Sequence, residues 1–365
     1  MKGICIGYKG AEKIMQKEVN EIINAKSKIE DSVVIFNIKN EKELCKLCYL
    51  GQSFSRVLLF IDSFKLEKIS DVKRKTDFSF LKGKKIQVKC ERIGEHGFSS
   101  MDIAKELSEH IFDKVKCSAD FKNPEIIIYV YIFNENCHIG VDYAGFDLSK
   151  RDYKVYLHPE AMKGTTAYFM LCIGNYNKNM VLLDPFCGSG VIPIEAAYFS
   201  SGFPINAFRK EKFQFIKIGI VDEKFLQKFD KKIKFKGKIY GYDSQMRHIN
   251  ASKQNAKIGG VEKLINFSRV DVEWLDTKFK KAEIDLIVTD LPHITKWNEK
   301  KIRKIYDEFF YQAEFTLKKN GRIVSISNND LKEAAKKQGF GLENEFTIQK
   351  KNQQLKIAVF KKEKI

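Results

Sequence analysis

Long apolar runs are missing from this 365-residue sequence, and its cysteines show no paired framework. No stretch approaches the roughly 18–20 apolar residues that a membrane-spanning helix needs, and the first residues lack the apolar centre of a signal peptide. Eight scattered cysteines are typical of free thiols in a reducing compartment. We therefore expect a cytoplasmic protein. Cys45 and Cys48 form a lone CxxC without a second pair, which favours core packing over a metal site.

Proline and glycine are also sparse, at 6 and 22 residues, whereas apolar residues make up 44% of the chain. This composition excludes disordered and fibrous classes, and the length predicts two or more globular domains. Acidic residues are in deficit, with 47 against 65 lysines and arginines and a net charge of +18. Such a surface attracts polyanions, so nucleic acid is the first partner to consider. A lysine-rich genome would give the same excess without any such partner.

The N-terminal part, up to about residue 145, alternates short strands and helices. Strands are predicted at residues 4–6, 32–38, 85–90 and 126–133, and helices at 12–24 and 101–115, from apolar periodicity. This pattern indicates two consecutive α+β units. The sequence shows no internal repeat, which excludes a solenoid.

From about residue 179 the pattern changes to buried strand, glycine turn, helix and strand, as in a parallel sheet wound by helices. A strand at 180–183 is followed by a turn at 188–190 and a helix at 191–199. Further strands are expected at 238–242, 264–270, 285–289, 321–327 and 354–360. The predicted fold class is α/β with a doubly wound, Rossmann-like sheet. Residues 202–236 form a long insertion whose role the pattern does not reveal.

Three features fall at the carboxyl ends of successive predicted strands. Gly188 and Gly190 allow a tight turn that a ligand can approach closely. Asp243 ends the next strand, where a carboxylate can accept ribose hydroxyls, and Asp271 follows the third strand, where it can border an adenine slot. A nicotinamide dehydrogenase would need a third glycine, but Pro193 stands at that position. The missing glycine therefore argues against a dehydrogenase.

The segment DPFCGSGVIPIEAA (184–197) resembles the first motif of amino-methyltransferases that act on nucleic-acid bases, and residues 241–271 resemble the second and third motifs. Residues 146–171 are similar to the linker between a THUMP domain and its methyltransferase, and residues 85–145 resemble THUMP itself. The resemblance implies S-adenosyl-L-methionine as cofactor and a ferredoxin-like region at 1–50, THUMP at 51–147, a linker at 148–178 and a Rossmann-fold methyltransferase at 179–365. The implied cofactor-binding residues are Thr165, Asp184, Phe186, Gly188, Gly190, Asp243, Ser244, Asp271 and Val272.

The predicted reacting end follows the strand at 285–289 and comprises Asp290, Leu291, Pro292 and His293. An exocyclic amine of guanine is a poor nucleophile, so an enzyme must orient it and polarise its N–H bonds. Asp290 and the Leu291 carbonyl can accept those hydrogens. The family commonly has proline at 291, Tyr or Phe at 293 and glycine at 294, so Leu291, His293 and Ile294 depart from its pattern.

Basic residues interleave with aromatic ones at 150–156, and phosphate contacts of this kind fix register without reading sequence. A solvated linker explains the same run. The resemblance favours RNA contacts from Arg151, Lys154 and Lys163, with THUMP gripping the tRNA acceptor end. We therefore predict an enzyme that methylates the N2 amine of a guanosine in tRNA. An rRNA guanine-N2 methyltransferase and a catalytically lapsed RNA-binding paralogue are the alternatives. We expect no metal and favour a monomer.

Overall fold

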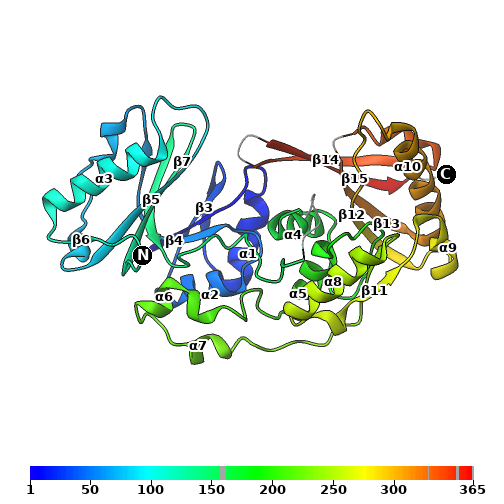
Figure 1. The fold of residues 1–365 in the computed structure, drawn as a ribbon, viewed down its shortest axis with the longest axis horizontal. Coiled ribbons are helices and arrows are strands. Elements are labelled where there is room, and N and C mark those ends of the chain that lie inside the picture. The colour runs from blue at the N-terminus through cyan, green and yellow to red at the C-terminus, as the bar shows by residue number, and fades with distance from the viewer. Residues whose placement is uncertain (157–161, 328, 351–352, 364–365) are drawn as a thin grey trace. The chain divides into compact units, whose positions relative to one another are not determined.

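The computed structural model describes residues 1–156, 162–327, 329–350 and 353–363. The chain forms two compact units, shown with the sequence-ordered colours of Figure 1. The first is built mainly from Met1–Leu148 and Arg209–Lys228, and the second mainly from Ser149–Phe208 and Phe229–Ile348. None of the helices within the described residues combines the length and apolar character needed to cross a bilayer.

The first unit contains one mixed sheet with the strand order β2-β3-β1-β4-β8-β7-β5-β6. Pairing between β4 and β8 joins the strands of the two predicted α+β units into this single sheet. Its elements are β1 (Lys2–Ile6), α1 (Glu12–Ile23), β2 (Ser27–Glu30), β3 (Val33–Asn37), α2 (Lys42–Leu50), β4 (Arg56–Lys65), β5 (Lys85–Ile93), α3 (Ser100–Lys114), β6 (Ser118–Ala119), β7 (Ile126–Phe133) and β8 (Asn136–Asp142). Cys45 and Cys48 are buried in α2.

Part of the insertion between α5 (Val191–Ser201) and β10 (Lys238–Asp243) belongs to the first unit. It carries the short helices α6 (Gln214–Lys217) and α7 (Glu223–Gln227). Phe213 is fully buried, with its ring centroid 6.3 Å from that of Tyr49. The side-chain amide of Gln214 donates to the carbonyl oxygens of Pro124 and Glu125 at 2.8 Å each. The insertion therefore completes the core of the unit that precedes it in the sequence.

The second unit has a seven-stranded sheet with the order β11-β10-β9-β12-β13-β15-β14. All neighbouring pairs from β11 to β13 are parallel, and β15 is antiparallel to β13. This arrangement confirms the predicted doubly wound α/β class. The remaining elements are α4 (Gly164–Ile173), β9 (Val181–Asp184), α8 (Met246–Ile258), β11 (Asn266–Arg269), α9 (Leu275–Lys278), β12 (Ile284–Asp290), α10 (Glu299–Thr316), β13 (Leu317–Ile326), α11 (Lys332–Lys337), β14 (Phe340–Lys350) and β15 (Gln353–Lys362).

Successive side chains of the central strands point to opposite faces of the sheet, and both faces are apolar. Ile287 and Ile323 belong to a buried cluster with Phe309 and Phe310 of α10. On the adjacent positions, Leu286 and Val324 lie against Gly174, which caps α4. The strand order reverses between β9 and β12, and crevices at such switch points are where open α/β sheets bind ligands.

Candidate active site

The glycine loop after β9 needs the left-handed backbone that glycine adopts most readily. Gly188 has φ +51° and Gly190 has φ +84°. A Cβ atom at Gly190 would lie 2.9 Å from Cβ of Ser252, so a side chain there would also clash. The Ser252 hydroxyl in turn donates to the Gly188 carbonyl at 2.8 Å. The loop therefore packs against α8, the helix that follows β10.

Asp243, at the end of β10, organises the floor of the crevice. Its Oδ2 accepts from the Gly188 amide at 3.1 Å, and its Oδ1 accepts from the Gln245 amide at 2.8 Å. His248 Nδ1 lies 3.0 Å from the same Oδ1. A carboxylate has about four acceptor sites, so these contacts orient Asp243 and leave Oδ2 able to accept a ligand hydroxyl. His248 was not predicted from the sequence.

Asp184, at the end of β9, is buried with 1% of its surface exposed. Its Oδ1 accepts from the Thr289 hydroxyl at 2.7 Å and from the Phe186 amide at 3.3 Å. Burial raises the pKa of Asp184 to about 8, and the neighbouring carboxylates of Asp290 and Asp243 add to this rise. The carboxyl therefore carries a proton at neutral pH and acts as a structural polar group.

The segment after β12 is fixed by α10. The Tyr306 hydroxyl donates to the Pro292 carbonyl at 2.5 Å and accepts from the Asn329 side-chain amide at 3.1 Å. Asn298 donates to the His293 carbonyl at 3.2 Å. Nδ1 of His293 is buried, and no hydrogen-bond partner for it lies within the described parts of the chain. A buried polar atom of this kind fits a site that a ligand completes.

These strand ends surround one cavity of about 510 Å³, within the range for small-molecule sites. Its wall combines carboxylates that can accept ribose hydroxyls with apolar residues such as Val272 and Ile192, so the donor set suits an adenosyl group. Most predicted site residues line it: Asp184, Phe186, Gly188, Asp243, Ser244, Asp271, Val272, Asp290, Leu291, Pro292 and His293. Gly190 and Thr165 do not line it, although Thr165 is buried at the start of α4. Residues that the sequence did not single out also contribute, including Met162, Cys187, His248, Asn298, Lys301 and Ile305.

The predicted RNA-contacting residues have different environments. The prediction that Arg151 contacts RNA is wrong. Its side chain and that of Glu195 are both fully buried, and Nε of Arg151 lies 2.8 Å from Oε1 of Glu195. A guanidinium engaged in this way does not face RNA. Lys154 donates to the Met162 carbonyl at 2.6 Å, and Lys163 donates to the Ser149 hydroxyl at 3.2 Å. Both lysines are partly exposed and remain predictions as RNA contacts.

Comparison with known proteins agrees with this geometry. Residues 151–356 match the UPF0020 family, described as an RMKL-like methyltransferase domain, and residues 66–142 match the THUMP domain. The chain is 28% identical over 360 residues to tRNA (guanine(6)-N2)-methyltransferase of Methanocaldococcus jannaschii, covering 93% of this chain and 94% of that protein. It is 31% identical over 194 residues to ribosomal RNA large subunit methyltransferase K/L of Buchnera aphidicola subsp. Acyrthosiphon pisum, covering 50% of this chain and 28% of that protein. The solved structure of the methyltransferase SMU.472 complexed with SAH superimposes with a TM-score of 0.81 at 17% identity, covering 100% and 98% of the two chains.

Together with the methyltransferase family match, the fold and cavity define an S-adenosylmethionine-dependent methyltransferase of the Rossmann-like class, in agreement with the predicted cofactor. The chain belongs to the UPF0020 family of RMKL-like methyltransferases and carries a THUMP domain before its catalytic domain. It is an RNA methyltransferase.

Proposed function

We propose that this enzyme methylates the exocyclic N2 amine of a guanosine in tRNA, with the THUMP-containing unit holding the acceptor end. One observation carries the catalytic part: Asp290, Leu291, Pro292 and His293 line the same cavity as Gly188 and Asp243. The cofactor, when bound, supplies a methyl carbon attached to a sulfonium. The tRNA substrate is supported by the similarity of nearly the full chain to the Methanocaldococcus enzyme.

The protein's contribution is to position and polarise the amine. Asp290 and the Leu291 carbonyl accept the two N–H groups of the amine, which directs its lone pair toward the methyl carbon. The proton that the amine loses on methylation would pass to the Asp290 carboxylate or to water. Tyr306 holds the Pro292 carbonyl and so fixes the turn in which both acceptors lie. The imidazole of His293 provides the surface on which the flipped guanine stacks.

A cavity on the first unit supports RNA binding there. It has a volume of about 530 Å³ and its lining includes Lys84, Lys122 and Lys217. Lys217 is supplied by the insertion that completes this unit. Lysine ammonium groups gathered around one opening attract phosphates, and such contacts determine how RNA is held without reading its sequence.

The test is to incubate the full-length protein with labelled S-adenosylmethionine and separate pools of unmodified tRNA and rRNA, followed by nucleoside analysis. We expect label in tRNA as N2-methylguanosine. Label confined to rRNA would overturn the substrate assignment, and label in another nucleoside would overturn the N2 assignment. If the cofactor binds but neither pool is labelled, the catalytic segment has lapsed.

A further inference from the structure

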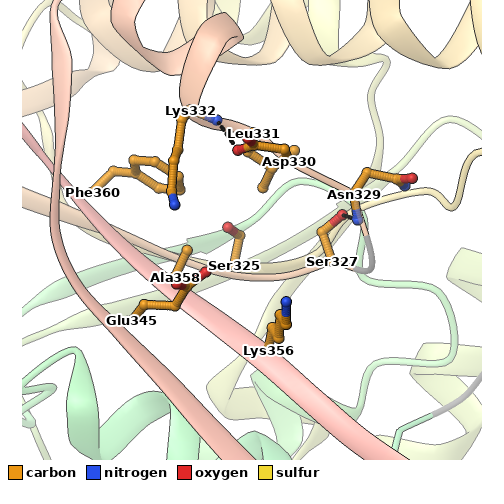
Figure 2. A pocket seen from close by; sticks show the side chains of 10 residues that line it. All are labelled: Ser325, Ser327, Asn329, Asp330, Leu331, Lys332, Glu345, Lys356, Ala358 and Phe360. Carbon is orange, nitrogen blue, oxygen red and sulfur yellow. Dashed lines mark hydrogen bonds between the residues drawn. The ribbon is translucent and has the colours of Figure 1, made fainter.

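A second cavity, of about 200 Å³, lies in the methyltransferase unit at the carboxyl end of β13 (Figure 2). It shares no lining residue with the cavity that contains Gly188 and Asp290. Most of its lining is polar, with Phe360 and Leu331 buried at its apolar side. The residues that line it are Ser325, Ser327, Asn329, Asp330, Leu331, Lys332, Glu345, Lys356, Ala358 and Phe360.

Ser325 carries an unused polar group at this site. Its side chain is fully buried, and within the described ranges no hydrogen-bond partner lies near its Oγ atom. Figure 2 shows that this oxygen points into the cavity. An unpaired buried hydroxyl costs about 1–3 kcal/mol, so its retention in a cavity far larger than one water indicates a polar ligand.

The charged side chains around Ser325 complement a sugar–phosphate group. Lys332 and Lys356 are exposed at the rim, and their ammonium groups are directed toward the cavity in Figure 2. Asp330 uses its Oδ1 to accept from the Lys332 backbone amide at 3.0 Å, so this oxygen serves the loop. Glu345 lines the cavity from β14, which is separated from β13 by β15 in the same sheet, and supplies an acceptor. Two cationic donors beside a hydroxyl and a carboxylate match one phosphate next to one ribose hydroxyl.

This cavity is adjacent to the reacting end. In the parallel pairing of β12 with β13, Asp290 is level with Ile326, and paired strands lie about 4.8 Å apart. Asn329, which lines the second cavity, donates to the Tyr306 hydroxyl. Tyr306 donates in turn to the carbonyl of Pro292, which lines the first cavity. One hydrogen-bonded chain therefore joins the two cavities within the same unit.

We infer that the second cavity binds the ribose–phosphate of an RNA nucleotide next to the one that is methylated. Lys332 and Lys356 contact the phosphate, and Ser325 and Glu345 contact the 2′-hydroxyl. Through Asn329 and Tyr306, the bound backbone fixes the position of the target base relative to Asp290. This inference rests on the proposed function, because it requires that the substrate is an RNA strand entering the same catalytic cavity.

The test measures RNA affinity of full-length variants at several salt concentrations, using tRNA and rRNA. We expect the double variant Lys332→Ala/Lys356→Ala to bind its substrate RNA about tenfold more weakly. The logarithmic salt slope should fall by about 0.7, the value expected when one phosphate is no longer neutralised. Cofactor affinity should be unchanged. The matched control is Lys336→Ala, which removes an exposed lysine from α11 outside the cavity lining.

An RNA affinity and salt slope equal to those of the Lys336→Ala control would overturn the inference. The inference would also be overturned if inorganic phosphate raised the Tm of the wild type but not of the double variant, while the two proteins bound RNA equally well. The cavity would then hold a free anion. Binding is measured without catalysis, so the two proposals can fail separately. If the protein methylates a different nucleoside but the double variant still loses RNA affinity, the proposed reaction is rejected and this site is retained. A Ser325→Ala variant keeps the lysines and should weaken binding of ribose-containing strands more than of their 2′-deoxy counterparts.

Discussion

Arg151 and Glu195 form a fully buried ion pair, joined by hydrogen bonds of 2.8 and 3.1 Å. The Tyr153 hydroxyl also donates to Glu195, at 2.8 Å. A Cβ atom at Gly164 would overlap Glu195 Oε1 and lie 2.5 Å from Arg151 Nε, so the start of α4 packs directly on the pair. This cluster fixes the segment before the catalytic domain to α5, the helix that follows the glycine loop.

Removing one partner of this ion pair should destabilise the folded protein without a specific effect on its RNA affinity. Arg151→Ala leaves Glu195 buried without its counter-charge, which typically costs about 3–5 kcal/mol. Urea unfolding should show this loss, while the RNA affinity of the folded fraction stays close to that of wild type. Lys154→Ala is the control from the same segment and should leave the free energy of unfolding within about 1 kcal/mol of wild type. A stable Arg151→Ala protein with weakened RNA binding would contradict this assignment.

Asp290→Ala should separate binding from chemistry. Loss of an acceptor that polarises the amine should lower turnover about a hundredfold or more. The cofactor dissociation constant, measured by calorimetry, should change little because Asp243 and the glycine loop remain. Asp243→Ala is the converse control and should weaken cofactor binding. Unchanged turnover in Asp290→Ala would assign the amine interaction to another group.

Tyr306 acts on the reaction by positioning the Pro292 carbonyl. Tyr306→Phe removes the hydroxyl that contacts both Pro292 and Asn329, and small displacements of reacting groups lower rates strongly. We expect kcat to fall about tenfold with little change in KM for the cofactor. Tyr311→Phe, on an exposed position of the same helix, is the matched control. Equal kcat values for the two variants would remove this role.

Asp184 should make stability depend on pH. Its folded-state pKa is about 8 because it is buried, whereas an unfolded aspartate titrates near about 3.9. Between these values the folded protein binds a proton that the unfolded chain releases, so this group lowers stability as pH rises and its effect levels off above 8. Asn is a neutral counterpart of the protonated carboxyl. The Tm difference between Asp184→Asn and wild type should increase from pH 5 to pH 8.5, and a constant difference would contradict the assigned pKa.

Lys217 tests whether the insertion takes part in RNA binding. The variant Lys122→Ala/Lys217→Ala should weaken binding to different tRNAs alike and reduce the salt slope, by about 0.7–0.9 for each phosphate that is no longer neutralised. Filter binding against salt measures both quantities, and Lys224→Ala in α7 is a control from the same insertion. The full chain is required, because a fragment of residues 1–145 would lack Phe213 and Gln214 and the interactions that they make.

The sequence predicts which strand ends meet around the cavity of about 510 Å³, because the determinants of that arrangement are local. Gly188, Asp243 and Asp290 each follow a strand whose apolar pattern is visible, and parallel strands bring their carboxyl ends to one edge. The sequence misassigns Arg151 because its partner lies 44 positions away and the surrounding run resembles a solvated basic segment. The role of the insertion cannot be predicted from the sequence for the same reason, because the Gln214 side chain donates a hydrogen bond to the carbonyl of Pro124, 90 positions earlier. His248 could have been found from its place five residues after Asp243, in the first turn of α8.

The insertion also affects the order in which the chain can fold during synthesis. The ribosome makes β9, the glycine loop and α5 before it reaches Phe213, yet Phe213 belongs to the core of the first unit. At roughly 5–20 residues per second, several seconds separate Leu148 from that residue. During this interval the first unit has its whole sheet but an incomplete core, while β9, the first strand of the second unit, has already been synthesised. Maturation of the two units therefore overlaps in time, and slowing translation before residue 209 should prolong the exposure of an unfinished first unit to proteases.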